Sequence, residues 1–293
     1  MSILEVNGLT KAYAGTLAVD HVSFALEEGT ATALIGPNGS GKTTTLSMIA
    51  GLLKETEGSI HKDFKSGVGF LPQYPQFFSW LSALEFTEMA AKISGVDDKN
   101  VRQQSIRTLE FVGLGAAVNK KTGAFSGGMR QRLGLAQAIV HQPKLLLLDE
   151  PVSALDPTGR REIMDLLKSL QKDTTILYST HILNDAEEMT DQLLFLKQGK
   201  LVEHGSLAEV KNRYAEPKIQ LRFESEQEAA AFQSRVLWPM DRNRNLIELP
   251  QTDHGPTMQQ VLEVLAQEGS GISGVNRKNV SLEEIFLKVA GDK

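Results

Sequence analysis

The stretch GPNGSGKTTT, residues 36–45, places three glycines, one lysine and three threonines in ten positions. It meets the pattern G-x-x-x-x-G-K-[ST] through Gly36, Gly41, Lys42 and Thr43. The apolar stretch ATALI (31–35) before it is typical of a buried strand, and TLSMIAGLL (45–53) after it is typical of a helix. Backbone N–H groups point into such a turn and the helix N-terminus carries a partial positive charge, so an anion is favoured there. The stretch therefore predicts a phosphate-binding loop rather than a turn with a surface lysine.

Each residue type in this loop has an expected task. The Lys42 ammonium is expected to reach the β- and γ-phosphates of a nucleotide, and the Thr43 hydroxyl to ligate Mg²⁺. Thr44 is expected to make a further phosphate contact. The predicted nucleotide-binding residues of the loop are Gly36, Pro37, Asn38, Gly39, Ser40, Gly41, Lys42, Thr43 and Thr44.

Two acidic residues end a second apolar stretch. KLLLLDE (144–150) contains four consecutive leucines, which indicate a buried parallel strand because they do not alternate with polar residues. Ligands gather at the carboxyl ends of parallel strands, so Asp149 and Glu150 are expected to face the phosphate loop. Asp149 is the candidate Mg²⁺ ligand and Glu150 the candidate general base for an attacking water. The alternative is that both acids only lead into a loop and cap a helix, which Pro151 makes awkward.

The composition limits the class of protein. A chain of 293 residues with 41% apolar residues can form one large domain or two, each with a hydrophobic core. Its formal net charge of −5 disfavours a nucleic-acid-coating protein, and without cysteine it forms no disulfide. The N-terminus lacks the pattern of a signal peptide, and no apolar run reaches the ~20 residues that span a bilayer. We therefore expect a soluble chain without direct membrane insertion, whose membrane role, if any, comes through a partner.

The chain is expected to divide near residue 215. Strands and helices alternate in residues 1–214, which predicts an α/β sheet with a helical subdomain at about 76–142. In residues 215–293, PKIQLRFE alternates apolar and polar residues, and three capping-box patterns follow, at Ser225, Thr257 and Ser281. We expect a small α+β accessory domain there, and no catalytic motif stands in it.

A third motif, FSGGMRQ (125–131), places Ser126 as an N-cap before two glycines that expose N–H groups. Alone it also fits an ordinary capped helix. Together with GPNGSGKTT, LLLLDEPVSALDP (145–157) and STH (179–181), in this order, it resembles the ATP-binding cassette (ABC) ATPases over residues 1 to about 210. The resemblance implies the P-loop NTPase fold of this family: a RecA-like sheet core, an antiparallel β subdomain and a helical subdomain. It also implies ATP and Mg²⁺ as cofactors.

The family's roles follow residue by residue. Gln73 matches the glutamine that senses Mg²⁺ and water, although it also fits a turn after Pro72. Ser126, Gly127 and Gly128 match the signature sequence, which in the family contacts the γ-phosphate bound to the other subunit. His181 matches the switch histidine that contacts the γ-phosphate.

Three further positions carry a family role beside an ordinary structural one. Asp156 matches the D-loop aspartate, and before Pro157 it is also a good helix N-cap. Tyr13 matches the aromatic residue that stacks on adenine, although it also fits a surface-packed tyrosine. Phe125 stands where the family commonly has leucine, which keeps an apolar anchor.

The stoichiometry and the partner follow from the same resemblance. The chain has one phosphate loop and one signature, and the family's site joins the loop of one subunit to the signature of another, so a homodimer of cassettes with two ATP molecules is expected. Four aromatic residues within 74–80, YPQFFSW, either pack the helical subdomain or receive a membrane permease, and we favour docking of the permease.

Three functions remain open: the motor of a membrane transporter, a ribosome-associated ATPase, and a chromosome or repair ATPase. Only about 50 residues lie between Gln73 and Ser126, too few for a long coiled coil, and the single cassette and negative charge favour the transporter. The tail resembles cassettes of drug, antibiotic-peptide and lipid-type exporters with a separate permease, while an importer remains the alternative. We expect a cytoplasmic chain, peripheral on the cell membrane through its permease.

Overall fold

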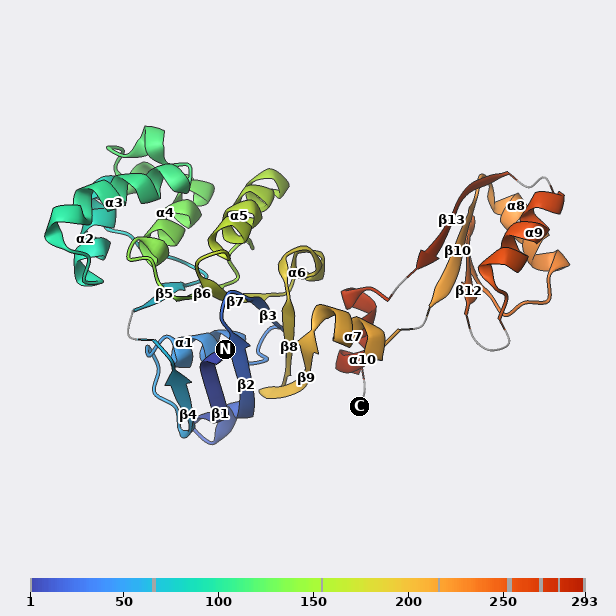
Figure 1. The fold of residues 1–293 in the computed structure, drawn as a ribbon, viewed down its shortest axis with the longest axis horizontal. Helices are drawn as coiled ribbons and strands as arrows, with labels where there is room; N and C mark the ends of the chain where they lie inside the picture. The colour runs from blue at the N-terminus through green and yellow to red at the C-terminus, as the bar shows by residue number, and fades with distance from the viewer. Residues whose placement is uncertain are drawn as a thin grey trace. The chain divides into compact units, whose positions relative to one another are not determined.

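The computed structural model describes residues 2–64, 67–153, 155–215, 217–251, 255–268, 271–278 and 280–291, so Ala154 of the LLLLDEPVSALDP motif lies outside it. The chain forms two compact units, residues 1–207 and 208–293 (Figure 1). The division lies slightly before the boundary at 214 that the sequence suggests, since the second unit already includes most of helix α7 (Leu207–Arg213).

A six-stranded sheet forms the centre of the first unit within the described residues. Five neighbouring strands run parallel, and β9 (Lys200–Ser206) is antiparallel to β8 (Gln192–Lys197) at one edge. Every residue of β3, β6 and β7 is buried, because both faces of the sheet are covered. The α/β prediction is confirmed. The strands, in their order across the sheet, are β5 (Val68–Leu71), β6 (Leu145–Asp149), β7 (Thr175–Thr180), β3 (Ala31–Ile35), β8 (Gln192–Lys197) and β9 (Lys200–Ser206).

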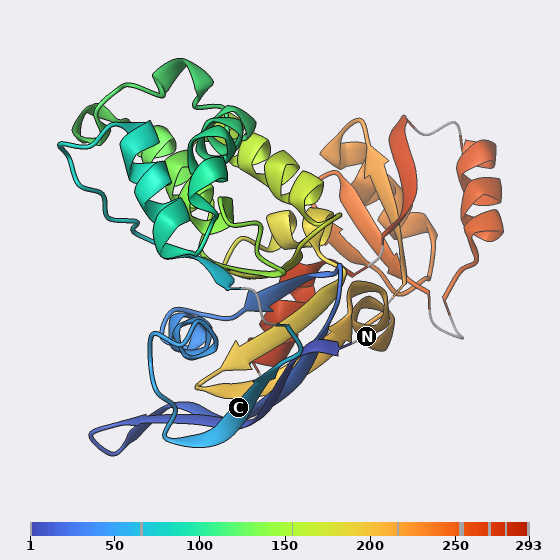
Figure 2. The same ribbon diagram turned by 60° about the vertical axis from the view of Figure 1, so that its left-hand side comes forward.

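A smaller antiparallel sheet covers one side of this centre. Its strand order is β2 (Thr16–Glu27), β1 (Ser2–Tyr13), β4 (Glu57–Lys62). Helix α1 (Lys42–Ile49), which follows the phosphate loop, shares one apolar core with both sheets; this core includes Leu9, Leu46 and Leu147. Figures 1 and 2 show this sheet and the helical subdomain on different sides of the core strands. The packing fixes the first turn of α1 against the sheet.

The helical subdomain is inserted between β5 and β6. It contains α2 (Ala83–Ile93), α3 (Asp98–Phe111) and α4 (Gly127–Ile139). The first α-helix after β5 begins at Ala83, because Ser82 and Glu85 form a reciprocal capping box there. Two further helices, α5 (Pro157–Leu170) and α6 (Leu183–Met189), follow β6 and β7. Among the described residues, no helix is both long and apolar enough to cross a membrane.

The second unit is an α+β structure with its own core. Helices α8 (Glu226–Arg235) and α9 (Met258–Glu268) pack on its four-stranded antiparallel sheet through Phe223, Phe232 and Val261. The three sequence-predicted capping boxes are confirmed by paired hydrogen bonds at Ser225, Thr257 and Ser281. Besides α7, the elements are β10 (Lys218–Phe223), α8 (Glu226–Arg235), β11 (Asp241–Asn243), β12 (Leu246–Pro250), α9 (Met258–Glu268), β13 (Ile272–Lys278) and α10 (Leu282–Gly291).

Candidate functional site

The carboxyl ends of four neighbouring parallel strands bring the predicted site residues to one edge of the core sheet. Strand β3 leads into the phosphate loop, and β5 leads to Gln73. Strand β6 ends at Asp149, with Glu150 next, and β7 leads to His181. The register aligns these ends, since Leu71 pairs with Leu148 and Asp149 with Ser179. This edge is where a ligand is expected in an open α/β sheet.

The phosphate loop has no room for side chains at two of its glycines. A Cβ on Gly36 would fall against the carbonyl oxygen of Leu196, and one on Gly41 would lie 2.5 Å from the carbonyl oxygen of Ala18. Gly41 also has a φ of 101°, which side-chain-bearing residues rarely adopt, and it is the N-cap of α1. Glycine at these positions lets the loop close tightly around the start of the helix.

Lys42 lies folded over this loop with only 7% of its surface exposed. Its ammonium donates hydrogen bonds to the carbonyl oxygens of Gly36 (2.7 Å) and Pro37 (3.2 Å) and lies 4.0 Å from the Glu150 carboxylate. Burial lowers the pKa of Lys42, and the charges of Glu150 and Asp149 oppose this shift. A bound phosphate would add negative charge beside the buried ammonium and favour its charged form.

Asp149 accepts hydrogen bonds from two hydroxyl groups. Thr43 Oγ1 donates to its Oδ2 at 2.8 Å, and Ser179 Oγ donates to its Oδ1 at 2.6 Å. A threonine hydroxyl and a carboxylate are oxygen ligands of the kind that Mg²⁺ takes together with substrate phosphates. Thr43 and Asp149 therefore fit a magnesium ion that a nucleotide completes.

Glu150 is buried, with 7% of its surface exposed, and is held in an unusual conformation. Its φ of 50° is uncommon for a residue with a side chain. Its backbone N–H donates to Ser179 Oγ at 2.9 Å, and its Oε2 lies 2.7 Å from Nδ1 of His181. Ser179 thus links Asp149 to Glu150, while His181 orients the carboxylate. We call the following residues the strand-end network: Lys42, Thr43, Asp149, Glu150, Ser179 and His181.

Apart from residues of the phosphate loop, the predicted site residues of four other segments lie outside this network, with Gly127 and Gly128 beside Ser126. Within the described part of the chain, no hydrogen bond or ion pair connects Tyr13, Gln73, Ser126 or Asp156 to it. Ser126 and Asp156 instead act as N-caps, accepting the backbone N–H of Met129 (α4, 3.3 Å) and of Gly159 (α5, 3.2 Å), respectively. Tyr13 is half exposed at the end of β1. One chain therefore assembles the phosphate loop, the acids and the histidine, but not the signature.

Two residues of the site were not singled out from the sequence. Ser179 joins Asp149 and Glu150 in the strand-end network through its hydroxyl group. Its position in STH, one residue before the end of β7, is the sequence feature that could have indicated this role. Gln131 on α4 donates a hydrogen bond to the carbonyl oxygen of Pro151, next to Glu150. No sequence spacing indicates that contact, because it joins two distant segments.

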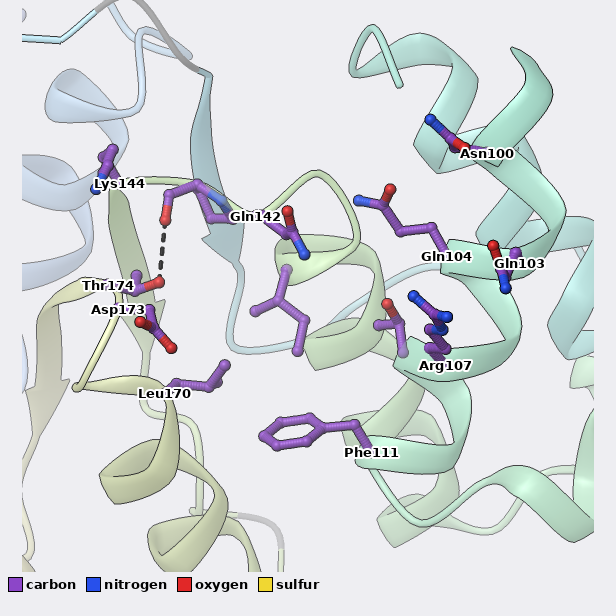
Figure 3. A pocket seen from close by; sticks show the side chains of 13 residues that line it. Asn100, Gln103, Gln104, Arg107, Phe111, Gln142, Lys144, Leu170, Asp173 and Thr174 are labelled. Carbon is purple, nitrogen blue, oxygen red and sulfur yellow. Dashed lines mark hydrogen bonds between the residues drawn. The ribbon is translucent and has the colours of Figure 1, made fainter. Parts of the chain in front are cut away.

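A separate cavity of about 680 Å³ lies at the opposite, amino ends of β6 and β7 (Figure 3). Polar side chains of α3, among them Gln104 and Arg107, line one side of it, and Leu170 and Asp173 lie on another. Thr174 Oγ1 donates a hydrogen bond to the Pro143 carbonyl oxygen at its edge. None of the predicted site residues lines this cavity. The cavity and the strand-end network therefore lie at opposite ends of the parallel strands.

Similarity to known proteins agrees with this geometry. The family model "ABC transporter" matches residues 19–153, and the model "ATP-binding protein DrrA1-3-like, C-terminal domain" matches residues 205–290. The chain is 41% identical to the uncharacterized ABC transporter ATP-binding protein YxlF of Bacillus subtilis (strain 168), covering 98% of this chain and 99% of YxlF. It is 38% identical to the bacitracin transport ATP-binding protein BcrA of Bacillus licheniformis, covering 72% of each chain.

A solved structure with the same fold is that of the ATP-binding cassette MJ0796, a dimer in a post-hydrolysis state bound to ADP and Pi. It matches with a TM-score of 0.64 and 28% identity, covering 70% of this chain and 98% of MJ0796.

The parallel sheet, the phosphate loop and the acids at the strand ends define a P-loop ATPase cassette. The chain belongs to the ATP-binding subunits of ABC transporters. It is therefore a nucleotide-binding ATPase that acts with a membrane permease.

Proposed function

We propose that two copies of this chain bind two ATP molecules between them and that hydrolysis drives an exporter whose permease is a separate protein. The observation that carries the dimer is the incomplete site of one chain: the strand-end network is assembled, while Ser126 lies outside it. The dimeric, ADP- and Pi-bound structure of MJ0796 supports this stoichiometry. ATP hydrolysis by an equal mixture of two inactive variants, one altered in the phosphate loop and one in the signature, tests this stoichiometry.

The network suggests a division of tasks within each site. Lys42 binds the β- and γ-phosphates, and Thr43 and Asp149 hold Mg²⁺, with Gln73 as a further ligand. Glu150 takes the proton of the attacking water, and His181 orients Glu150 and contacts the γ-phosphate. Mg²⁺, when bound, would offset charge on the phosphates.

The predicted site residues outside the strand-end network have roles in binding the adenine and in contacts with the partner subunit. Tyr13 stacks on the adenine, since its half-exposed ring ends β1 near the start of the cassette. Ser126, Gly127 and Gly128 bind the γ-phosphate held by the partner, because the first turn of α4 offers free backbone N–H groups. Asp156, which starts α5, lies at the dimer interface.

Export is the direction that the second unit and one relative favour. The model "ATP-binding protein DrrA1-3-like, C-terminal domain" matches that unit, and the BcrA relative is a bacitracin transport protein. We propose a drug, antibiotic-peptide or lipid-like substrate that contacts the permease only. The chain would then lie on the cytoplasmic face of the membrane, held there by its permease.

The aromatic segment after Gln73 is the proposed docking site of the permease. Phe77 packs edge-to-face on Phe86 with ring centroids 5.0 Å apart, so it belongs to the subdomain. Trp80 is 68% exposed, and Tyr74 and Phe78 are also exposed. Exposed aromatic residues are enriched at protein interfaces.

Replacing Trp80 with alanine is expected to weaken permease binding by at least about tenfold, as truncation of a central aromatic contact does. The measurement is recovery of a polytopic membrane protein with the tagged chain from detergent-solubilised membranes, beside ATPase activity of the purified chain. Ile93→Ala is the matched control, since Ile93 is also an exposed apolar residue of the helical subdomain but lies at the end of α2. Equal recovery with Trp80→Ala and wild type would contradict the docking site.

A further inference from the structure

Gln131 connects the signature helix to the loop of the catalytic acid. It lies on α4, five residues after Ser126, and only 5% of its surface is exposed. Its Nε2 donates a hydrogen bond of 2.7 Å to the carbonyl oxygen of Pro151, the residue after Glu150. Because this carbonyl lies against a buried side chain, its hydrogen bond is not easily replaced by water.

The next residue, Arg132, connects the same helix to two other segments. One guanidinium nitrogen donates to the carbonyl oxygen of Val112 at 2.8 Å, at the end of α3, and another binds the Glu162 carboxylate of α5. Gly113 approaches so closely that a Cβ there would lie 2.8 Å from this guanidinium. Helix α4 is thus tied to the end of α3 and to α5, the helix that begins after Asp156.

We propose that Gln131 is a positioning residue through which the signature of a chain acts on Glu150 of the same chain, with the Arg132–Glu162 pair as a second connection. The proposal rests on the dimer of the proposed function. In that dimer, Ser126 of one chain contacts the ATP bound to the partner, while Glu150 of the same chain acts on the ATP bound to its own phosphate loop. Five helical residues span only about 7.5 Å, so a displacement of the first turn of α4 moves Gln131 by nearly the same amount. Occupation of one site would then align the acid of the other.

Glu150 is suited to such control because its conformation depends on its neighbours. Its φ of 50° persists only if the surroundings hold it. Ser179 holds its backbone N–H from β7, and Gln131 holds the following carbonyl from α4. Of these two supports, only Gln131 belongs to the signature helix. The consequence is positive cooperativity between the two ATP sites.

The test is ATP hydrolysis by the full chain with Gln131→Met, which keeps the length of the side chain and removes the donor. We expect the Hill coefficient for ATP to fall from about 2 in wild type toward about 1, because a dimer has two coupled sites. We expect kcat to fall about tenfold, and the Kd of a single chain for a fluorescent ATP analogue to stay within about twofold. A merely structural role would not selectively remove the cooperativity.

Gln104→Met is the matched control. Gln104 makes the same kind of bond from α3, to the backbone carbonyl of Val140, but at the far end of α4. This variant should keep the wild-type Hill coefficient and kcat. If Gln131→Met keeps the wild-type Hill coefficient, or if Gln104→Met loses it equally, the inference is wrong.

A second variant and the behaviour of wild type separate failure of this inference from failure of the proposed function. If Gln131→Met does not fold, the variant Glu162→Ala tests the inference instead, because Glu162 is exposed and its loss should leave the fold intact. Glu162→Ala should lower the Hill coefficient for ATP. An unchanged Hill coefficient would overturn the inference. If wild type dimerises on ATP but hydrolyses it without cooperativity, this inference alone fails. If wild type does not dimerise at all, the proposed function fails with it.

Discussion

Glu150→Gln is expected to lower kcat for ATP hydrolysis by about 10²-fold or more, the contribution of a positioned general base. Glutamine has nearly the shape of glutamate but cannot take a proton from water. The backbone bond from Glu150 to Ser179 stays available to the variant, so the loop should keep its fold. ATP binding should remain, and the variant should accumulate as a dimer with unhydrolysed ATP.

The measurements are phosphate release and molar mass by light scattering, each with and without ATP. Glu203→Gln is the matched control, because Glu203 is an equally buried glutamate of the same sheet but lies on the edge strand β9. Its kcat should equal that of wild type. Normal hydrolysis by Glu150→Gln would show that another group is the base.

Lys42→Ala is expected to weaken ATP binding by at least about 10²-fold and to abolish measurable hydrolysis, since two or more hydrogen bonds from a charged group, each worth about 1.5–3 kcal/mol, are lost. The ammonium already contacts the carbonyl oxygens of Gly36 and Pro37 in the loop that would hold the phosphates. No other described lysine makes these contacts. Binding of a fluorescent ATP analogue measures the effect.

Lys62→Ala separates this effect from general loss of a lysine. Lys62, on β4, also has a pKa lowered by burial, but it lies on the small antiparallel sheet away from the phosphate loop. Its variant should bind ATP as wild type does. Equal binding by Lys42→Ala and Lys62→Ala would remove Lys42 from the phosphate site.

The sequence predicted those parts of the molecule that local patterns determine. The positive φ angles of Gly39 and Gly41 belong to the local conformation of the phosphate loop, and the buried strand ending at Asp149 follows from its leucines. The capping boxes at Ser225 and Ser281 follow from spacings of three residues. Each of these is decided by neighbours along the chain.

Contacts between distant segments could not be predicted in this way. The bonds of Ser179 to Asp149 and of Gln131 to Pro151 depend on strand register and on the packing of α4. Tertiary structure decides these features.

The measurement that tests the composite site most directly mixes two inactive variants. Lys42→Ala disables the phosphate loop, and Gly127→Asp places a charge on the signature that repels the partner's ATP. Gly127 is exposed with open space around its Cα, and an acidic residue in the first turn stabilises α4, so this variant should fold.

Each variant alone should be inactive. An equal mixture should regain between about a fortieth and about a quarter of the wild-type rate. Half of randomly paired dimers are mixed and each mixed dimer has one intact site, while the loss of coupling from the disabled site lowers the rate of that site by up to about tenfold. A mixture no more active than its two components would contradict the account, because it would mean that the loop and the signature of a single chain act on the same ATP.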